Sequence, residues 1–420
     1  MEVILRCCAG LDIHKDSVEA CVRRTSAGGK VEHEVRHWGT TTRELVEMSD
    51  WLSSLRVTQV AMESTGVYWK PIFNILEEHF EILLANAHHL KNVPGRKTDI
   101  RDCQWIAQLL QHGLLKGSFI PPRPQRELRD LTRQRTQLVD EASRISNRIQ
   151  KVLEDANIKL GSVASNVVGA SGRLMLEAIV AGQDDPAQLA DLAKLRLRAK
   201  IPQLEQALYG KLTGHHRWML RLLLDQLETT ERYITRLDQR IAELTRPQQP
   251  VLEKLDAIPG VDRRVAEVLL AEIGPDVTPF PSDAHLASWA GICPGNNQSA
   301  GKNRSGKTTK GCRWLRQALV QAAWAASHKK DSYFQAHARN LMRRRGRKRG
   351  LVAVAHSLLT VIYHMLKEGT TYCDLGPLFL DQIRATHLIR FHVRRLEKLG
   401  LQVVLNPQTA YFSGQILRLR

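Results

Sequence analysis

Hydrophobic positions in the first 120 residues alternate between a strand period and a helix period. Residues 3–37 contain three short apolar runs, VILRCCAGLDI, SVEACVRR and VEHEVRHW, with a Ser-Ala-Gly-Gly turn before the last. This pattern predicts an antiparallel meander. It is followed by a helix in TTRELVEMSDWLSSL with a Thr cap, a strand in QVAMEST, a helix in VYWKPIFNILEEHF and a strand in EILLANA. Strands that alternate with helices predict an α/β domain over residues 1–120, and Pro-Pro-Arg-Pro at 121–124 marks its boundary.

Two heptad-like seams follow and predict a coiled-coil region over residues 121–250. The stretch at about 160–200, between the seams, contains Gly, Ser and Asp-Asp-Pro, which favours short helices or a loop. Heptads alone do not distinguish long helices packed within one chain from a dimer interface. The seam positions are Leu128, Leu131, Arg135, Leu138, Ala142, Ile145, Ile149, Val152 and Ala156, and then Leu220, Leu223, Leu227, Thr230, Ile234, Leu237, Ile241 and Leu244.

From residue 251 the pattern becomes globular and helical again, which predicts a domain over 251–370. Ile258-Pro259-Gly260-Val261 is followed by an apolar helix and resembles a helix-hairpin-helix turn that could hold a phosphate, although a plain packing turn fits equally well. A Gly/Ser-rich basic loop at 295–311 precedes helices at 312–328 and 351–367. The tail at 371–420 is left unassigned.

Composition and charge indicate a polyanionic partner. The 420-residue chain carries a net charge of +18 and has a pI near 9.8, with 43% hydrophobic and 25% charged residues. These fractions exclude a fully disordered basic tail. The chain start shows no signal peptide and no run of about 18 uncharged apolar residues occurs, so we expect neither secretion nor a membrane span. Seven cysteines without a C-x-x-C pair fit a reducing prokaryotic cytoplasm.

The positive charge is concentrated in one stretch. Residues 1–120 carry 14 basic and 15 acidic side chains, whereas residues 301–350 carry 15 basic side chains and one acid. A run of cations interleaved with Gly and Ser predicts a loop wrapped on nucleic acid. That run consists of Lys302, Arg304, Lys307, Lys310 and Arg313. For the second run, which includes Arg343, Arg344 and Arg345, an unstructured or merely solvated segment is an equal alternative.

Four acids of the first domain lie where strands or helices end. Asp12 ends the first strand, Glu63 ends a buried strand, and Asp99 and Asp102 are three residues apart in a predicted helix, which would place them on one face. Carboxylates about 5 Å apart repel by about 3 kcal/mol per pair at an effective dielectric of 20, so a cluster requires protonation or a divalent cation. Oxygen ligands of this kind favour Mg²⁺, with Mn²⁺ as an alternative. Singly, each acid has a purely structural alternative: Asp99 and Asp102 could complement a helix dipole, Asp12 could form a turn, and Glu63 could be an exposed strand end.

These residues resemble a known family. GLDIHK with Asp12, MESTGVYW with Glu63, and KTDIRDCQWIAQLL with Asp99 and Asp102 are similar to the RuvC-like, ribonuclease H-like domain of DEDD transposases, the insertion-sequence family numbered one hundred and ten. LDAIPGVDRRVAEVLLAEIG and LASWAGICPGNNQSAGKNRSGKTTKGCRWLRQAL resemble that family's C-terminal transposase domain. The resemblance covers about 1–115 and 251–370.

The resemblance implies an RNA-guided DNA recombinase, whose partners are DNA and an element-encoded bridge RNA. It implies that the four acids bind Mg²⁺ and that a serine attacks a DNA phosphate. By position that serine is Ser299; because Ala300 stands where the family commonly has Gly, Ser305 in its Ser-Gly pair is the rival. Active sites composed from two protomers would give the heptads a role in forming a dimer or tetramer.

Two other functions fit parts of the pattern. A metal-only nuclease or junction resolvase would use water as the nucleophile and would not need Ser299. A non-catalytic nucleic-acid scaffold would use the coiled coil and the basic loop, but a cluster of acids that repels phosphate is of no use to it. The sequence therefore favours a transposase that works through a phosphoserine intermediate.

Overall fold

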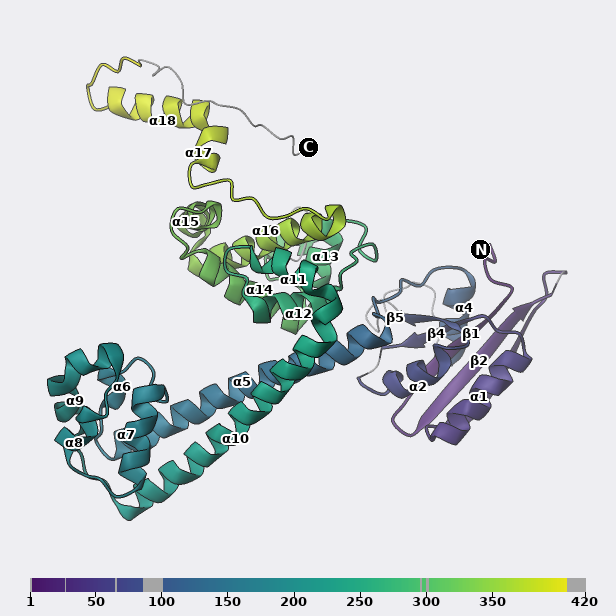
Figure 1. Ribbon diagram of the computed structural model, residues 1–420. Coiled ribbons are helices and arrows are strands. Elements are labelled where there is room, and N and C mark those ends of the chain that lie inside the picture. The colour runs from purple at the N-terminus through teal and green to yellow at the C-terminus, as the bar shows by residue number, and fades with distance from the viewer. Residues whose placement is uncertain are drawn as a thin grey trace. The chain divides into compact units, whose positions relative to one another are not determined.

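A computed structural model divides the chain into two units, Met1–Pro122 and Arg123–Arg420 (Figure 1). It describes residues 2–26, 28–64, 66–85, 101–294, 297–299 and 302–405, and only the backbone of 297–299 and 302–305. Each unit is considered by itself below.

Unit 1 is built on a five-stranded sheet with the order β3-β2-β1-β4-β5. The predicted meander is present: β1 pairs antiparallel with β2, and β2 pairs antiparallel with β3. Strand β4 then runs parallel to β1, and β5 runs parallel to β4. The strands are β1 (Cys7–Ile13), β2 (Ser17–Thr25), β3 (Val31–Gly39), β4 (Gln59–Glu63) and β5 (Glu81–Ala85).

Helices cover both faces of this sheet. The helices are α1 (Thr42–Ser54), α2 (Trp69–Leu76) and α4 (Asp102–Gln111). Because side chains alternate along a strand, Ala9 and Leu11 of β1 pack into the core beneath α1 and α2, whereas Cys8 packs with Trp105 and Ile106 of α4 on the opposite face. Figure 1 shows α4 on the face opposite α1 and α2. As expected, Thr41 caps α1 and accepts a hydrogen bond from the Glu44 N–H.

Unit 2 begins with two long helices, α5 (Arg123–Asp155) and α10 (Gly214–Thr245), which pack against each other along their lengths (Figure 1). They run antiparallel, since Arg135 near the start of α5 bonds to Asp238 near the end of α10, and Asp155 at the end of α5 bonds to His216 at the start of α10. The two predicted seams are therefore used within one chain. Most seam positions are buried or half-buried, but Leu244 is exposed.

Short helices fill the connection between α5 and α10, as predicted for about 160–200. They are α6 (Leu160–Val163), α7 (Ala170–Val180), α8 (Pro186–Asp191), the 3-10 helix η1 (Leu195–Lys200) and α9 (Ile201–Leu208). Their apolar residues form one cluster with the ends of α5 and α10.

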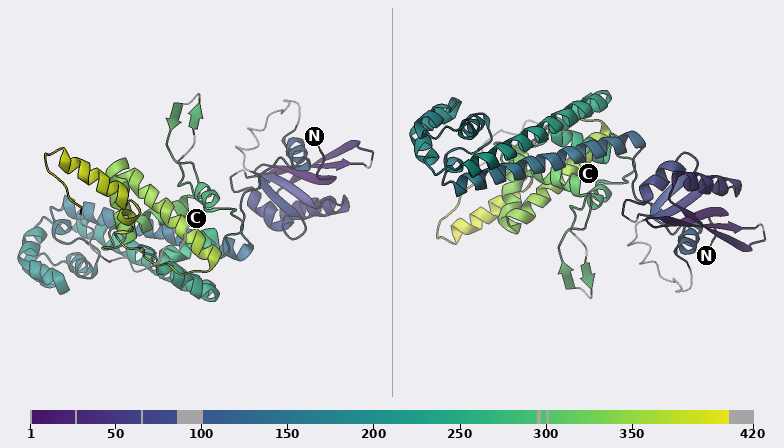
Figure 2. Two further views of the ribbon diagram at one scale, coloured as in Figure 1. Left: turned by 90° about the horizontal axis from the view of Figure 1, so that it is seen from above. Right: turned by 90° about the horizontal axis from the view of Figure 1, so that it is seen from below.

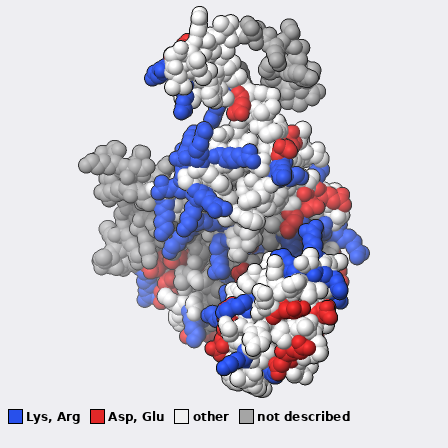
Figure 3. Space-filling view, turned by 90° about the vertical axis from the view of Figure 1, so that its left-hand side faces the viewer, with Lys and Arg blue, Asp and Glu red and all other residues white. Residues whose placement is uncertain are grey.

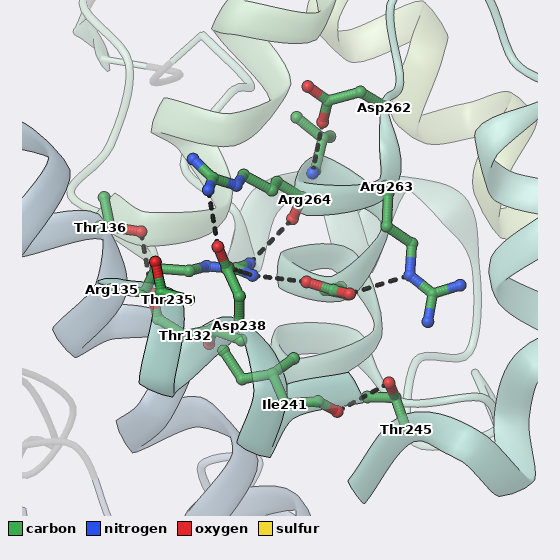
Figure 4. A network of polar contacts seen from close by, with 12 residues as sticks. Thr132, Arg135, Thr136, Thr235, Asp238, Ile241, Thr245, Asp262, Arg263 and Arg264 are labelled. Carbon is green, nitrogen blue, oxygen red and sulfur yellow. Dashed lines mark hydrogen bonds and ion pairs between the residues drawn. The ribbon is translucent and has the colours of Figure 1, made fainter. Parts of the chain in front are cut away.

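Arg135 occupies a seam position where an apolar residue would be expected, and an ion-pair network explains its burial (Figure 4). Its Nη1 lies 2.9 Å from Asp238 Oδ1 and 2.6 Å from Glu267 Oε2, while Arg263 and Arg264 of α12 (Arg263–Ile273) pair with the same two acids. A buried charge needs such partners. The network joins α5, α10 and α12. Unit 2 begins at Arg123, so it holds all but the first two residues of the expected division 121–250, and the whole of 251–370.

The rest of unit 2 is helical apart from one two-stranded ribbon. Its elements are η2 (Arg246–Gln248), α11 (Gln249–Asp256), α12 (Arg263–Ile273), α13 (Asp283–Trp289), β6 (Asn297–Ser299), β7 (Lys302–Ser305), α14 (Arg313–Ala326), α15 (Tyr333–Arg345), α16 (Arg347–Glu368), α17 (Phe379–Ile383) and α18 (Ala385–Glu397). The unassigned tail thus contains two helices, neither of which has a buried residue.

By length and composition, one helix in the described part of the chain, α16, could cross a membrane. It packs against α13, α14 and α15. Its residues Val354, Leu358 and Ile362 are fully buried in that contact. A core helix of this kind passes the same composition test.

Candidate active site and nucleic-acid interface

Two of the predicted acids lie at the carboxyl ends of neighbouring parallel strands. Strand β1 pairs with β4 so that Leu11 is opposite Met62, which places Asp12 beside Glu63 one residue later. Asp12 lies two residues beyond Gly10 and Glu63 two residues beyond Ala61, so both carboxylates are on the α4 face of the sheet. The prediction that strand ends deliver these acids to one edge is confirmed for this pair.

The third acid, Asp102, is the first residue of α4. A Cβ placed on Gly10 would lie 2.4 Å from the carbonyl oxygen of Cys103 and 2.3 Å from the Ala107 nitrogen, so the start of α4 lies almost directly on β1. Glycine is required there because any side chain would collide with backbone. This close approach brings Asp102 to the end of the sheet that carries Asp12.

The expected pairing of Asp99 with Asp102 involves a residue outside the described part of the chain, because Asp99 is not described. Arg101 has a ψ of 146°, which is extended backbone, and α4 begins at Asp102. Asp102 is a first-turn acid, as the alternative interpretation allowed.

Electrostatics confirm that three of the acids act on one another. Burial raises the pKa of Asp12, whose side chain is 18% exposed, and the negative charges of Asp102 and Glu63 raise it further. His14 opposes this shift, with its Nε2 3.4 Å from Asp12 Oδ2. A carboxyl in this position is stabilised as an anion if a cation joins it.

Sequence reasoning missed Glu19. The β1–β2 register places it directly opposite Asp12, and its charge also raises the Asp12 pKa. Directly paired residues of an antiparallel hairpin project from the same face, so the predicted meander held the signal that could have revealed this acid. Arg101 partly balances it, with Nη1 3.8 Å from Glu19 Oε1.

The donor set suits a hard divalent cation because it is made of carboxylate oxygens. Within the residues that the structure describes, no three His, Cys, Asp or Glu side chains are close enough together to hold a metal ion. The acids converge on one end of the sheet without forming a closed ligand set there.

In unit 2, the predicted serines lie on the β6–β7 ribbon, which stands away from the helices (Figure 2). Ser299 is opposite Lys302 next to the turn, whereas Ser305 is opposite Asn297, nearer the base. Their side chains, like those of Lys302 and Arg304, lie outside the described residues. The structure therefore places both serines on one ribbon without choosing between them.

The two ends of the loop that carries this ribbon are in close backbone contact at its base. A Cβ on Gly311 would lie 2.2 Å from the Gly291 nitrogen, and Gly291 has a φ of +70° that favours glycine. Above this contact, Pro294 bridges to Thr308. These backbone contacts fix the point at which the ribbon leaves the helices.

A buried ion cluster lies next to the Gly291–Gly311 contact. Glu272 of α12 is fully buried and accepts two hydrogen bonds from Arg133, at 2.7 and 2.8 Å. Cys312, which follows Gly311, donates its thiol to Glu272 at 3.3 Å. Burial and the Glu272 charge raise the pKa of Cys312 to about 11, so the thiol keeps its proton at neutral pH. This bond ties the loop to the α5–α12 contact.

The predicted basic residues that are described surround the same loop. Lys307, Lys310 and Arg313 lie at its end. Arg343, Arg344 and Arg345 form the last turn of α15, where cations complement the helix dipole, so the alternative of an unstructured run is wrong. Figure 3 shows Lys and Arg side chains gathered on a face of unit 2 below its C-terminal helices.

The Pro-Gly turn at 258–261 is a packing turn. A Cβ on Gly260 would lie 2.2 Å from the Ala322 oxygen of α14, and Ile258 and Val261 are buried. The N-terminus of α12 is capped by Asp262, which accepts the Val265 N–H at 2.8 Å. An acid in the capping position disfavours a phosphate there.

Comparison with known proteins gives matches in both units. Residues 9–158 match an IS110 family model described as a transposase, and residues 252–339 match a model described as transposase IS116/IS110/IS902 family. The chain is 29% identical to an uncharacterized protein of insertion element IS110 from Streptomyces coelicolor, over 68% of this chain and 74% of the relative. It is 25% identical to a probable family 20 transposase from Pseudomonas aeruginosa, over 78% of this chain and 89% of the relative.

A similarity over a smaller part of the chain extends to a gene-inverting protein. The pilin gene-inverting protein of Moraxella bovis is 29% identical over 33% of this chain and 45% of its own length. Transposases and a gene-inverting protein are thus both similar to this chain.

Proposed function

Because this chain belongs to the IS116/IS110/IS902 family of transposases, we propose that it cuts and rejoins DNA with metal-binding carboxylates and a serine nucleophile. Its activity as a transposase and DNA recombinase follows from the family. The observation that carries the proposed chemistry is the convergence of Asp12, Glu63 and Asp102 on one end of the unit 1 sheet.

In this proposal Asp12, Glu63, Asp99 and Asp102 hold Mg²⁺, with Mn²⁺ as a substitute. Bound there, the ion would supply positive charge to the phosphate under attack. The acids of the chain itself orient that charge and, by their mutual repulsion, favour its binding. Glu19 adds a fifth carboxylate to the same end of the sheet.

The proposed nucleophile is Ser299, with Ser305 as the rival. Its hydroxyl gives up a proton and forms an ester bond to phosphorus, while the displaced DNA oxygen takes a proton. A hydroxyl of another strand then attacks the same phosphorus, which releases the serine and joins the strands. A free hydroxyl is a weak nucleophile, so the neighbouring cations Lys302 and Arg304 are assigned to charge stabilisation.

The remaining features of the proposal are guidance by a bridge RNA, a RuvC-like fold in unit 1, a homodimer or homotetramer, and a cytoplasmic location in a prokaryote. The sheet order β3-β2-β1-β4-β5, with three antiparallel strands followed by two parallel ones, supports a ribonuclease H-like fold. The paired helices α5 and α10 expose Leu222, Tyr233 and Leu244, which supports further association as a coiled coil.

Trapping the covalent intermediate tests the chemistry. The full chain is incubated with Mg²⁺, bridge RNA and DNA of the element ends, and the protein–DNA adduct is mapped by mass spectrometry. We expect the adduct on Ser299, its loss in Ser299→Ala, and its persistence in Ser305→Ala. An adduct that persists in Ser299→Ala and disappears in Ser305→Ala would transfer the role to Ser305.

A metal-dependent nuclease is the second candidate, because the carboxylates of unit 1 are assembled without any contribution from the serine ribbon. Water would then be the nucleophile. This alternative predicts hydrolysed DNA ends and full cleavage by both serine variants, and it would replace the first proposal if that result were found.

A further inference from the structure

A basic cavity of about 1030 Å³ lies against α15 and α16, at the base of the loop that carries Ser299 and Ser305, called the serine loop below. Gly306 and Thr308, one and three residues after Ser305, form part of its wall, and Pro294 forms another part. The cavity is therefore continuous with the segment that carries both candidate nucleophiles.

Among the described residues, five cations line this cavity and no Asp or Glu does. They are Lys307, Arg316, Arg345, Lys348 and Arg349. Within the described part of the chain, the last four make no ion pair. By contrast, the buried Arg133 and Arg135 each have a carboxylate partner. Unpaired cations that share one hollow repel one another, so the hollow is stabilised by an anion.

The start of α16 increases this positive field. Gly346 provides no side-chain cap for the helix, and the first turn carries Arg347, Lys348 and Arg349 without any acid. Cations are unfavourable at a helix N-terminus, where the free N–H groups already carry partial positive charge. The arrangement is one in which an anion would satisfy both the N–H groups and the side chains.

The floor of the cavity is apolar. Ile292 and Leu341 are 2% and 8% exposed, and Val352 and Ala353 of α16 lie beside them. A phosphate group alone would leave this floor bare. A nucleotide has the required pair of properties, since its base is a flat, weakly polar ring and its phosphate is an anion.

We propose that this cavity holds an unpaired nucleotide of a polynucleotide strand, with the base on the Leu341–Val352 floor and its phosphate among the cations of α15 and α16. This inference rests on the proposed function and specifies the form of nucleic acid that reaches the serine loop. In a duplex the bases are stacked inside and only phosphates face outward, so a duplex does not fill a concave apolar floor.

A polar pair is placed to contact the edge of such a base. His337 Nε2 lies 3.0 Å from Ser357 Oγ, and both side chains line the cavity. Tyr333 stacks on the His337 ring with an interplanar angle of 12° and fixes its orientation. In the described part of the chain, no Trp, Tyr or Phe lines the cavity.

That composition makes 2-aminopurine a direct probe. Its fluorescence is quenched by neighbouring bases and rises when it is unstacked, and among the described lining residues there is no Trp, Tyr or Phe to restore the quenching. The full chain, without added divalent metal, is titrated into 20-nucleotide single strands of DNA and of RNA with a central 2-aminopurine, and into the matching DNA duplex. We expect a fluorescence rise with a single strand, and tighter binding of it than of the duplex by about tenfold.

Val352→Trp fills the floor and leaves every cation in place. It is expected to weaken single-strand binding about tenfold with little change in duplex binding. Arg345→Ala should weaken single-strand binding more than duplex binding. Its matched control is Arg343→Ala, which removes the same charge from the same helical turn outside the cavity. This control should weaken single-strand binding and duplex binding by the same factor.

Circular dichroism of each variant checks folding, and Arg345→Ala keeps the test open if Val352→Trp fails to fold. Preference for DNA or for RNA identifies which strand enters, and either supports the proposal. Equal affinity for single strand and duplex without a fluorescence change, or identical behaviour of Arg345→Ala and Arg343→Ala, would overturn it. Because binding is measured without catalysis, this result leaves the serine chemistry to its own adduct test.

Discussion

The surroundings of Asp12 disfavour the negatively charged form of its side chain. Burial and three neighbouring carboxylates raise its pKa, and among the described residues His14 opposes them by favouring the anion. Because the pKa in the folded state is above that in the unfolded state, this group stabilises the fold only at low pH. That contribution is lost as the pH rises through the folded-state pKa, so at neutral pH the ionised side chain destabilises unit 1.

Asp12→Asn should therefore stabilise the protein while it abolishes recombination. Without divalent metal, we expect the free energy of unfolding to rise by about 1 kcal/mol, the usual size of such trade-offs at active sites. Urea denaturation at pH 7, with and without Mg²⁺, measures this change. Added Mg²⁺ should stabilise the wild-type protein more than the variant, since the variant has lost one ligand.

Asp50→Asn is the matched control, because Asp50 is an exposed acid on α1. It should change neither stability nor activity measurably. A loss of stability in Asp12→Asn, or retained recombination, would contradict the assignment of Asp12 to a shared cation site.

The pKa of His337 is shifted in the opposite direction to that of Asp12, so the imidazole remains neutral at physiological pH. Burial lowers its pKa from the usual 6.5, and the charges of Arg344 and Arg384 lower it further. In the window below pH 6.5 the unfolded chain thus binds more protons than the folded chain, so stability rises with pH there and is lost as the pH falls through the window.

His337→Gln should reduce this acid sensitivity. We expect the urea midpoint of the wild-type protein to fall more steeply between pH 6.5 and pH 5 than that of the variant. His387→Gln, an exposed position on α18, controls for loss of a histidine as such. Parallel curves for wild type and His337→Gln would show that His337 is not responsible.

At the scale of elements, the contact of α4 with β1 determines whether the acids meet. Gly10 allows the helix backbone to lie directly on the strand, and Asp102 is the residue from which that helix starts. A side chain at position 10 would push α4 outward and carry Asp102 away from Asp12.

Gly10→Ala should destabilise unit 1 by about 1–3 kcal/mol, as overpacked cores usually do, and should reduce recombination. Thermal unfolding followed by circular dichroism measures the first effect. Gly28→Ala is the control, since a Cβ there would meet only the Ser26 Oγ at 4.0 Å. If the two substitutions behaved alike, the close approach would not be what positions α4.

Much of unit 1 could be predicted because its signals are local. The meander, the Thr41 cap and the strand ends at Asp12 and Glu63 all follow from alternation and capping. The start of α4 at Asp102 could not be predicted, because no proline or glycine marks the extended backbone at Arg101.

The other features that the sequence did not predict depend on contacts between residues far apart in the chain. Arg135 lies at a position of the predicted seam, and its distant partners Asp238 of α10 and Glu267 of α12 explain why a cation is buried there. The basic cavity likewise joins residues 292–357, which are far apart in sequence and share no periodic pattern. Such groupings depend on tertiary packing, which the order of residues along one element does not contain.

At the scale of the whole molecule, the two proposed halves of the chemistry belong to different units. The carboxylates lie in unit 1, and both candidate serines lie in unit 2 with most of the positive charge. A complete site therefore requires unit 1 of one chain to meet unit 2 of the same chain or of a partner. Mixing two inactive variants distinguishes these cases.

Asp12→Asn lacks a carboxylate but keeps Ser299, and Ser299→Ala has the reverse defect. If sites are shared between protomers of a dimer, a mixed dimer contains one site with both intact halves and one with neither. Random pairing makes about half of the dimers mixed, so an equimolar mixture should recover roughly a quarter of wild-type sites. Sites built within one chain would recover none, because every chain in the mixture is defective. The two variants are mixed under conditions that allow subunit exchange, and recombination of a donor and target DNA pair is measured against each variant alone. Activity that stays at the level of the single variants, with exchange verified by differently labelled chains, would assign each site to a single chain.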